Sequence, residues 1–145
     1  MSDGFEDHRG ELNRKLEKAI EKALYEAGEF VQGEAGDELQ NSPARVRWGR
    51  LKNSIDFKVT KDPEHNNDDC VVVGTNVKYA VYVHEGTGIY HPNGRRTKWR
   101  YRSEYDGKWY TTRGMKANRF LKNAIKKNEK QIKENIAASI RDDMR

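Results

Sequence analysis

The sequence has little that would hold a fold together covalently or carry it into a membrane. Its 145 residues include a single cysteine, Cys70, so the chain cannot form an internal disulfide. Cys70 heads an apolar run, and we expect it to be a buried core residue. No apolar stretch is long enough to span a bilayer, and we find no signal-peptide core. These absences predict one domain, residues 1–145, made in a reducing cytoplasm or in an assembly formed there.

The sequence also lacks the motifs of the common catalytic and cofactor sites. Gly86-Thr-Gly88 lacks the third glycine of a dinucleotide fingerprint and the Gly-Lys-Ser/Thr of a phosphate-binding loop. The spacing of His84 and His91 matches no zinc motif, and no nucleophile motif is present. We therefore expect no metal, no cofactor and no enzymatic activity. A small hydrolase that works through His84 or Glu85 is the catalytic alternative.

Charge is abundant but unevenly distributed along the chain. Charged residues make up 35% of the sequence and the mean hydropathy is −1.10, yet the apolar residues are clustered and periodic, which indicates a folded domain. The net charge is only +5, whereas residues 95–122 contain ten lysines and arginines against two acids. This local excess of positive charge marks the candidate surface for an acidic partner.

Apolar residues at helical spacing mark both ends of the chain. After a polar segment, residues 1–10, that we expect to be flexible, a stripe predicts a helix from Glu11 to Gly36 or Leu39. Glycines weaken its second half but permit close approach of a sheet, and they are Gly28, Gly33 and Gly36. A second stripe from Phe120 to Ile140 predicts a C-terminal helix with lysines on its exposed side.

The middle of the chain has the pattern of strands and turns. Alternation predicts a half-buried strand over Leu51–Thr60, and the apolar run Cys70–Val73 predicts a strand buried on both faces. The polar turn between them, residues 61–69, predicts an antiparallel hairpin. The next segment, Val77–Val83, fits either a strand or a short helix through Tyr79–His84, because its apolar residues satisfy both periods.

A second hairpin is predicted beyond the glycine turn. Asp106-Gly107 stands between two runs in which aromatic residues alternate with arginine and lysine, and Asp-Gly in such a setting is a strong hairpin signal. Because alternate residues are charged on both arms, we interpret residues 86–113 as a projecting loop and ribbon. The predicted fold is α+β, with a small antiparallel or mixed sheet packed by a long N-terminal helix and a C-terminal helix.

The predicted ribbon carries the candidate binding residues. Trp, Tyr and Arg are enriched at protein–protein hot spots, and the same mixture can stack bases and follow phosphates of single-stranded nucleic acid. We favour a protein interface, and a small basic nucleic-acid-binding module is the alternative. The candidate residues are Arg95, Arg96, Lys98, Trp99, Arg100, Tyr101, Arg102, Trp109, Tyr110 and Arg113.

Short stretches spread along nearly the whole chain carry a family resemblance. They are Gly49–Ile55, Val73–Ala80, Tyr82–Gly88, Trp99–Tyr101, Trp109–Met115 and Arg119–Leu121. In their order and spacing the chain resembles the neck proteins of long-tailed bacteriophages and prophages, known as tail-component, tail-completion or head–tail joining proteins. It departs from that family at Pro43–Gly49, before the first strand, and at Lys116–Arg119, where the family often has prolines.

The resemblance implies a structural virion protein without catalytic residues or cofactors. Proteins of this family join head and tail as ring-forming subunits, often sixfold, in the virion neck. The implied partners are other neck, head-completion or tail proteins and further copies in a homo-oligomeric ring, with a monomer as the alternative free form. The implied location is the virion neck or tail, and the bacterial host cytoplasm during assembly. Nucleic-acid contact stays open, and no membrane is implied.

Overall fold

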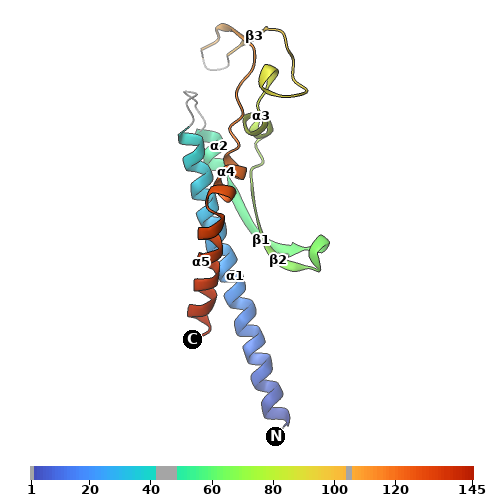
Figure 1. Ribbon diagram of the computed structural model, residues 1–145, viewed down its shortest axis with the longest axis vertical. Coiled ribbons are helices and arrows are strands. Elements are labelled where there is room, and N and C mark those ends of the chain that lie inside the picture. The colour runs from blue at the N-terminus through green and yellow to red at the C-terminus, as the bar shows by residue number, and fades with distance from the viewer. Residues whose placement is uncertain (1, 42–48, 104–105) are drawn as a thin grey trace.

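The computed structural model shows an elongated α+β molecule built along one long N-terminal helix (Figure 1). It describes residues 2–41, 49–103 and 106–145. The first half contains helix α1 (Ser2–Gln40), helix α2 (Gly49–Ser54), strands β1 (Asp56–Asp62) and β2 (Asp68–Gly74), and helix α3 (Ala80–Glu85). The second half contains strands β3 (Trp99–Arg102) and β4 (Trp109–Thr112), and helices α4 (Phe120–Lys127) and α5 (Glu129–Asp143). Single 3₁₀ turns lie at Pro63–His65 and Gly88–Tyr90.

The strands form two separate antiparallel hairpins, β1–β2 and β3–β4. Helix α1 contacts both strands of the first hairpin, while α4 and α5 pack along α1 (Figure 1). The second hairpin lies at the end of the molecule farthest from the N-terminus. The predicted fold class is therefore confirmed, with the C-terminal helices resting on the long helix.

The core is organised along one ridge of α1. Its buried hydrophobic residues recur every four positions, which places them on a ridge that winds gradually around the helix, and they are Ala19, Ala23, Ala27, Val31, Ala35 and Leu39. The alanines allow close packing against the C-terminal helices, because a small side chain keeps two helix axes near each other. At the other end of the row, Leu51, Val83 and Phe120 are almost fully buried, and they join α2, α3 and α4 into one cluster.

Two boundaries in the first half differ from the sequence-based predictions. Helix α1 begins at Ser2 and not near Glu11, because a nucleated helix extends at low cost through residues without an apolar stripe. The strand predicted over Leu51–Thr60 is wrong in its first part, where the chain forms α2. Leu51 and Ile55 are both buried, and their spacing of four residues suits a helical turn as well as an alternating strand.

The predicted antiparallel pairing of the first hairpin is confirmed, with Phe57 opposite Val73 and Val59 opposite Val71. The prediction that Cys70–Val73 is buried on both faces is wrong, since Val72 is 55% exposed and Cys70 is half-buried. A two-stranded sheet with one face on α1 leaves its other face open, so an apolar run alone does not indicate double burial.

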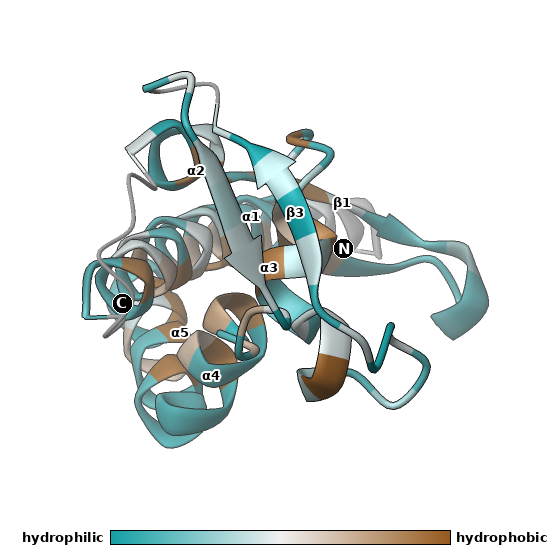
Figure 2. Cartoon of the chain, turned by 90° about the horizontal axis from the view of Figure 1, so that it is seen from above, coloured by the Kyte–Doolittle hydropathy of each residue, from teal (hydrophilic) through white to brown (hydrophobic). Residues whose placement is uncertain are grey.

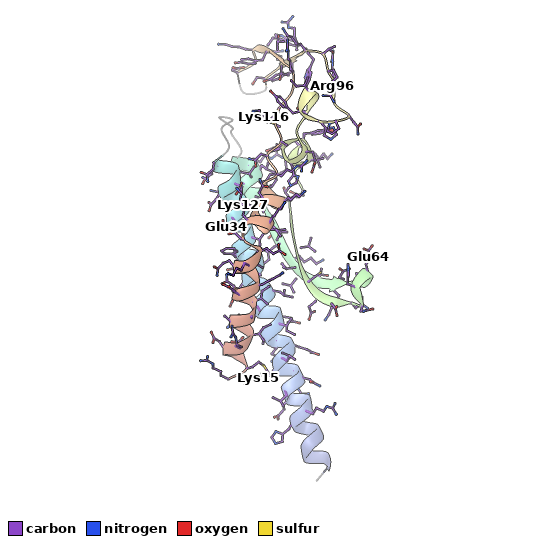
Figure 3. The ribbon with its side chains drawn as sticks, viewed as in Figure 1. Lys15, Glu34, Glu64, Arg96, Lys116 and Lys127 are labelled. Carbon is purple, nitrogen blue, oxygen red and sulfur yellow. The ribbon has the colours of Figure 1, made fainter. Side chains whose placement is uncertain are left out.

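The later segments settle two further points. Of the two alternatives for Val77–Val83, the helix is found, since Ala80 and Val83 are buried at helical spacing within α3. The single C-terminal helix that we predicted is divided at Asn128, whose side chain donates to the carbonyl of Ala124 at 2.9 Å. Lys127, next to this break (Figure 3), pairs with Glu38 of α1 at 2.8 Å.

The surface of the described chain is strongly polar. Figure 2 shows hydrophilic residues along β3 and along the outer part of the β1–β2 hairpin. Among the helices in the described ranges, none combines the length and the apolar character that a bilayer crossing requires.

Gly28 provides a test of how the first hairpin is seated on α1. A Cβ atom at this position would lie 2.7 Å from Cγ of Phe57, whereas a Cβ at Gly33 would have no neighbour within 4 Å. We expect Gly28→Ala to lower the free energy of unfolding, because overpacking costs about 1–3 kcal/mol and exceeds the helix-propensity gain. The matched control Gly33→Ala should raise it by up to about 1 kcal/mol. Urea denaturation measures both, and equal stabilisation by the two substitutions would contradict this seating.

Candidate functional site

The projecting segment begins and ends at a paired base beside α3. The N–H of Thr87 donates to the carbonyl of Met115 at 2.9 Å, and the N–H of Ile89 donates to the carbonyl of Arg113 at 3.0 Å. The N–H of Met115 in turn donates to the Thr87 hydroxyl at 2.9 Å. These bonds join the two ends of the segment 87–115, which we call the ribbon module.

Two glycines make this paired base possible. Gly88 has φ +62° and Gly114 has φ +131°, values that side chains rarely adopt. A Cβ at Gly88 would lie 2.7 Å from the carbonyl carbon of Arg113, and one at Gly114 would lie 2.7 Å from that of Thr87. The glycine-rich turn that the sequence marks at residues 86–88 therefore serves a close backbone approach.

The β3–β4 ribbon has two chemically different faces. Alternation along each strand, with Trp99 opposite Thr112 and Arg102 opposite Trp109, sorts the side chains. The arginine face consists of Arg100, Arg102, Trp109 and Thr111, and the aromatic face consists of Trp99, Tyr101, Tyr110 and Thr112.

On the arginine face, the cations lie over or beside an exposed indole. The guanidinium carbon of Arg100 is 5.3 Å from the ring centroid of Trp109, a distance typical of a cation–π contact. Trp109 is 59% exposed, which is high for so large an apolar ring. The Nε of Arg102 donates to the carbonyl of Gly107 at 3.0 Å, so this arginine also holds the turn.

The aromatic face is a stack of exposed rings. Tyr101 and Tyr110 lie opposite each other with centroids 5.9 Å apart and planes 30° apart, and they are 46% and 42% exposed. Trp99 is half-buried, with the guanidinium carbon of Arg95 at 5.8 Å from its ring centroid. This face offers flat apolar area to a partner.

The remaining predicted residues flank the strands and differ in how they are engaged. Arg96 donates from Nη1 to the carbonyl of Ile89 and from Nη2 to that of Pro92, both at 2.9 Å, so it braces the loop before β3. Lys98 and Arg113 are exposed and form no ion pair within the described residues. The structure thus gathers six of the ten predicted residues on two paired strands and places four beside them.

Ile89 and Tyr90 of the same module are further exposed residues, and no sequence pattern predicted them as part of the site. They are 37% and 44% exposed and lie in the 3₁₀ turn that follows the paired base. Their neighbours alternate in no regular pattern, so periodicity gave no reason to select them. An exposed apolar pair next to a glycine turn was the available signal.

The acid of the ribbon turn is engaged within the ribbon. The carboxylate of Asp106 accepts hydrogen bonds from the Tyr110 hydroxyl and, at 2.9 Å, from the Lys108 N–H. The hydroxyl and then the backbone N–H hold the pKa of Asp106 below its ordinary value. This carboxylate therefore holds the turn in place, and it forms no ion pair with Arg100 or Arg102 of the arginine face.

His84 and Glu85 fasten α3 to the start of α4. Nδ1 of His84 lies 2.8 Å from the Glu85 carboxylate, and its Nε2 accepts the N–H of Lys122 at 3.4 Å. The hydrogen bond from His84, together with the charge of Arg119, lowers the pKa of Glu85 below its ordinary value. Both ring nitrogens thus have structural contacts. In the described ranges, no three His, Cys, Asp or Glu side chains gather as a metal site would require.

Comparison with known proteins gives one finding about the family. The family model for the bacteriophage HK97-gp10 tail component, HK97-gp10-like, matches residues 3–86. The match spans α1, α2, the first hairpin and α3, and it ends at Gly86, immediately before the ribbon module. No curated protein and no solved structure shows significant similarity to the chain.

The turn of the ribbon should respond to acid. Because the pKa of Asp106 is lowered in the folded ribbon, its carboxylate stabilises the turn above its ordinary pKa, and this contribution is lost as pH falls through the folded-state value. We expect the amide signals of Lys108 and Trp109 in NMR spectra to shift toward unfolded values during acid titration, before far-UV circular dichroism reports loss of the helices. Asp106→Asn should remove this local transition, and its persistence in that variant would contradict the assignment.

Proposed function

The chain belongs to the HK97-gp10-like family of bacteriophage tail components, and from this we propose that it is a neck subunit that joins head and tail as part of a ring. Family membership gives the coarser role, a structural component of a phage tail. The neck position, the ring and the joining step are our proposal. The observation that carries them is the ribbon module, a rigidly based projection with exposed apolar rings and with cations that pair with no carboxylate of the described residues.

The body of the molecule suits a subunit that must keep its shape under contact. Its core joins α1, α2, α3 and α4 through nearly solvent-free side chains, and α5 extends the packing along α1. The family match lies on most of this body. A ring closes when each subunit makes the same heterologous contact with the next, and a firm body fixes the rotation between neighbours.

The ribbon module suits the docking part of such a subunit. Trp, Tyr and Arg supply most of the energy at protein interfaces, and all three types are exposed on β3 and β4. The pairing of Arg100 with Trp109 already orients both side chains, which lowers the entropy lost on binding. We propose that other neck, head-completion or tail proteins contact this module in the virion.

We further propose that the role is not catalytic. The His84–Glu85 pair, which a hydrolase would need, is occupied by the Lys122 N–H and the Arg119 charge. In this proposal the protein is found in the host cytoplasm before assembly and in the virion afterwards.

A nucleic-acid-binding role is the second candidate, and the aromatic face is the observation that favours it. Tyr101 and Tyr110 present stacked rings, and Arg95 and Lys98 lie next to β3, as in surfaces that bind single strands. The same rings serve a protein partner equally well, so salt-dependent binding decides between the two candidates.

Removal of the exposed Arg100–Trp109 pair should prevent head–tail joining and leave the fold intact. We expect Arg100→Ala combined with Trp109→Ala to abolish head–tail joining, because both side chains are exposed and support no core contact. Complementation of a phage that lacks this protein, scored by infectivity and by electron microscopy of free heads and tails, measures the effect. Tyr82→Ala, on α3 and 61% exposed, is the matched control and should join normally. Full infectivity of the double variant would overturn the proposal.

The second candidate makes an opposite prediction in a binding assay. If the ribbon were a nucleic-acid module, mixed single-stranded oligonucleotides would bind, and the affinity would fall steeply with salt. Our proposal expects no such binding at physiological salt, measured by fluorescence anisotropy with the Tyr101→Ala variant as the reference. Tight binding that this variant loses would favour the nucleic-acid candidate.

A further inference from the structure

The first hairpin ends in a tip whose charge is opposite to that of the ribbon module. Its acidic residues lie at the end of β1, in the 3₁₀ turn that follows and at the start of β2, and they are Asp62, Glu64, Asp68 and Asp69. We call this group the acidic tip. The hairpin carries it away from α1 to the side of the molecule (Figure 1).

Two members of the acidic tip are used by the tip itself. Asp62 accepts the N–H of Glu64 at 3.0 Å and lies 2.6 Å from Nδ1 of His65, and Asp69 pairs with Lys61. The carboxylates of Glu64 and Asp68 are exposed and have no partner in the described chain. Two of the acids therefore fix the shape of the tip. The other two are available for an external cation.

The cations of the ribbon module likewise lack partners of opposite charge among the described residues. Within the described residues no carboxylate pairs with Lys98, Arg100 or Arg102. Arg100 is oriented by the Trp109 ring and Arg102 by the Gly107 carbonyl. The ribbon thus presents arginines that are held in place without a carboxylate partner in the part of the chain that the structure describes.

The acidic tip and the ribbon of one subunit do not meet. Figure 3 shows Glu64 at the end of the first hairpin, at the side of the molecule, and Arg96 in the ribbon module near the top, well apart from it. Two complementary surfaces that lie apart on one chain can pair with each other only between copies. Such a contact is heterologous, and it closes into a ring when the rotation between copies allows.

We propose that the arginine face of β3–β4 docks on the acidic tip of a second copy of this chain, and that this contact links neighbouring subunits of the ring. The inference rests on the proposed ring function, and it names the partner of the ribbon within that ring. Charge complementarity selects the second copy, since Glu64 and Asp68 of the tip, and Arg100 and Arg102 of the ribbon, have no partner of opposite charge among the described residues. Trp109 supplies the apolar centre of the contact and the ion pairs set its orientation.

Charge reversal on each side, and on both together, tests the contact in the full-length protein. The ribbon variant is Arg100→Glu with Arg102→Glu, and the tip variant is Glu64→Arg with Asp68→Arg. Sedimentation velocity across a concentration series at low and at high salt measures self-association. We expect each variant to self-associate at least about tenfold more weakly than the unaltered chain, and the fourfold variant to recover. The matched control Lys126→Glu with Lys130→Glu, on exposed lysines of α4 and α5, should not change association.

Cross-linking keeps the test decisive when association is weak. Zero-length carbodiimide coupling joins carboxylates to lysines, so Lys98 or Lys108 of one subunit should couple to Glu64 or Asp68 of another. A mixture of ¹⁵N-labelled and unlabelled chains identifies such links as intermolecular by mass spectrometry. An unaltered chain that stays monomeric and gives no such link overturns the inference, and so does a tip variant that associates normally.

The outcomes separate this contact from the neck function. If the fourfold variant recovers association while a phage that lacks this protein still joins heads to tails, the contact stands and the neck function fails. If that double variant abolishes joining but tip reversal changes nothing, the ribbon binds another virion protein and only the inference fails. Loss of oligonucleotide binding on ribbon reversal, with self-association unchanged, would assign the arginine face to nucleic acid and also overturn the inference.

Discussion

The row of small apolar residues along α1 is the constraint on which the rest of the structure depends. Ala23 and Ala27 let the C-terminal helices lie close, while Val31 and Leu39 meet the cluster built around Phe120. This one helix therefore supplies the surface on which the first hairpin and the C-terminal helices pack. Because the hairpin, α3 and α4 each contact this helix or its cluster, the positions of both projections derive from it.

Sequence periodicity predicted the elements that are long or strongly patterned. The two amphipathic helices, the two antiparallel hairpins and the α+β class follow from spacing, from turn residues and from the Asp106-Gly107 signal. The errors fall where two periods coincide or where burial depends on the neighbours. Leu51 and Ile55 fit a helix and a strand equally, and the exposure of Val72 depends on the number of strands in the sheet.

The candidate site was predictable in composition but not in arrangement. Alternation predicts that Arg100 and Arg102 share a face, yet only the register shows Trp109 beside them. The use of Arg96 to brace the loop could not be read from the sequence, because its acceptors are backbone carbonyls. In the sequence the acidic tip has the pattern of an ordinary polar turn. Its proposed role depends on the arginine face, which lies elsewhere in the fold.

The paired base of the ribbon module also determines how mechanical force travels through the subunit. The bonds between Thr87 and Met115 are followed by one from the Asn118 N–H to the carbonyl of Val83, 2.8 Å long, and Val83 is buried beside the core cluster. A pull on the ribbon is therefore shared among several hydrogen bonds at its base and passed on to the core, and it does not fall on a single pivot. Tension applied at one end of the particle would then strain the interior of the subunit before the ribbon could swing free.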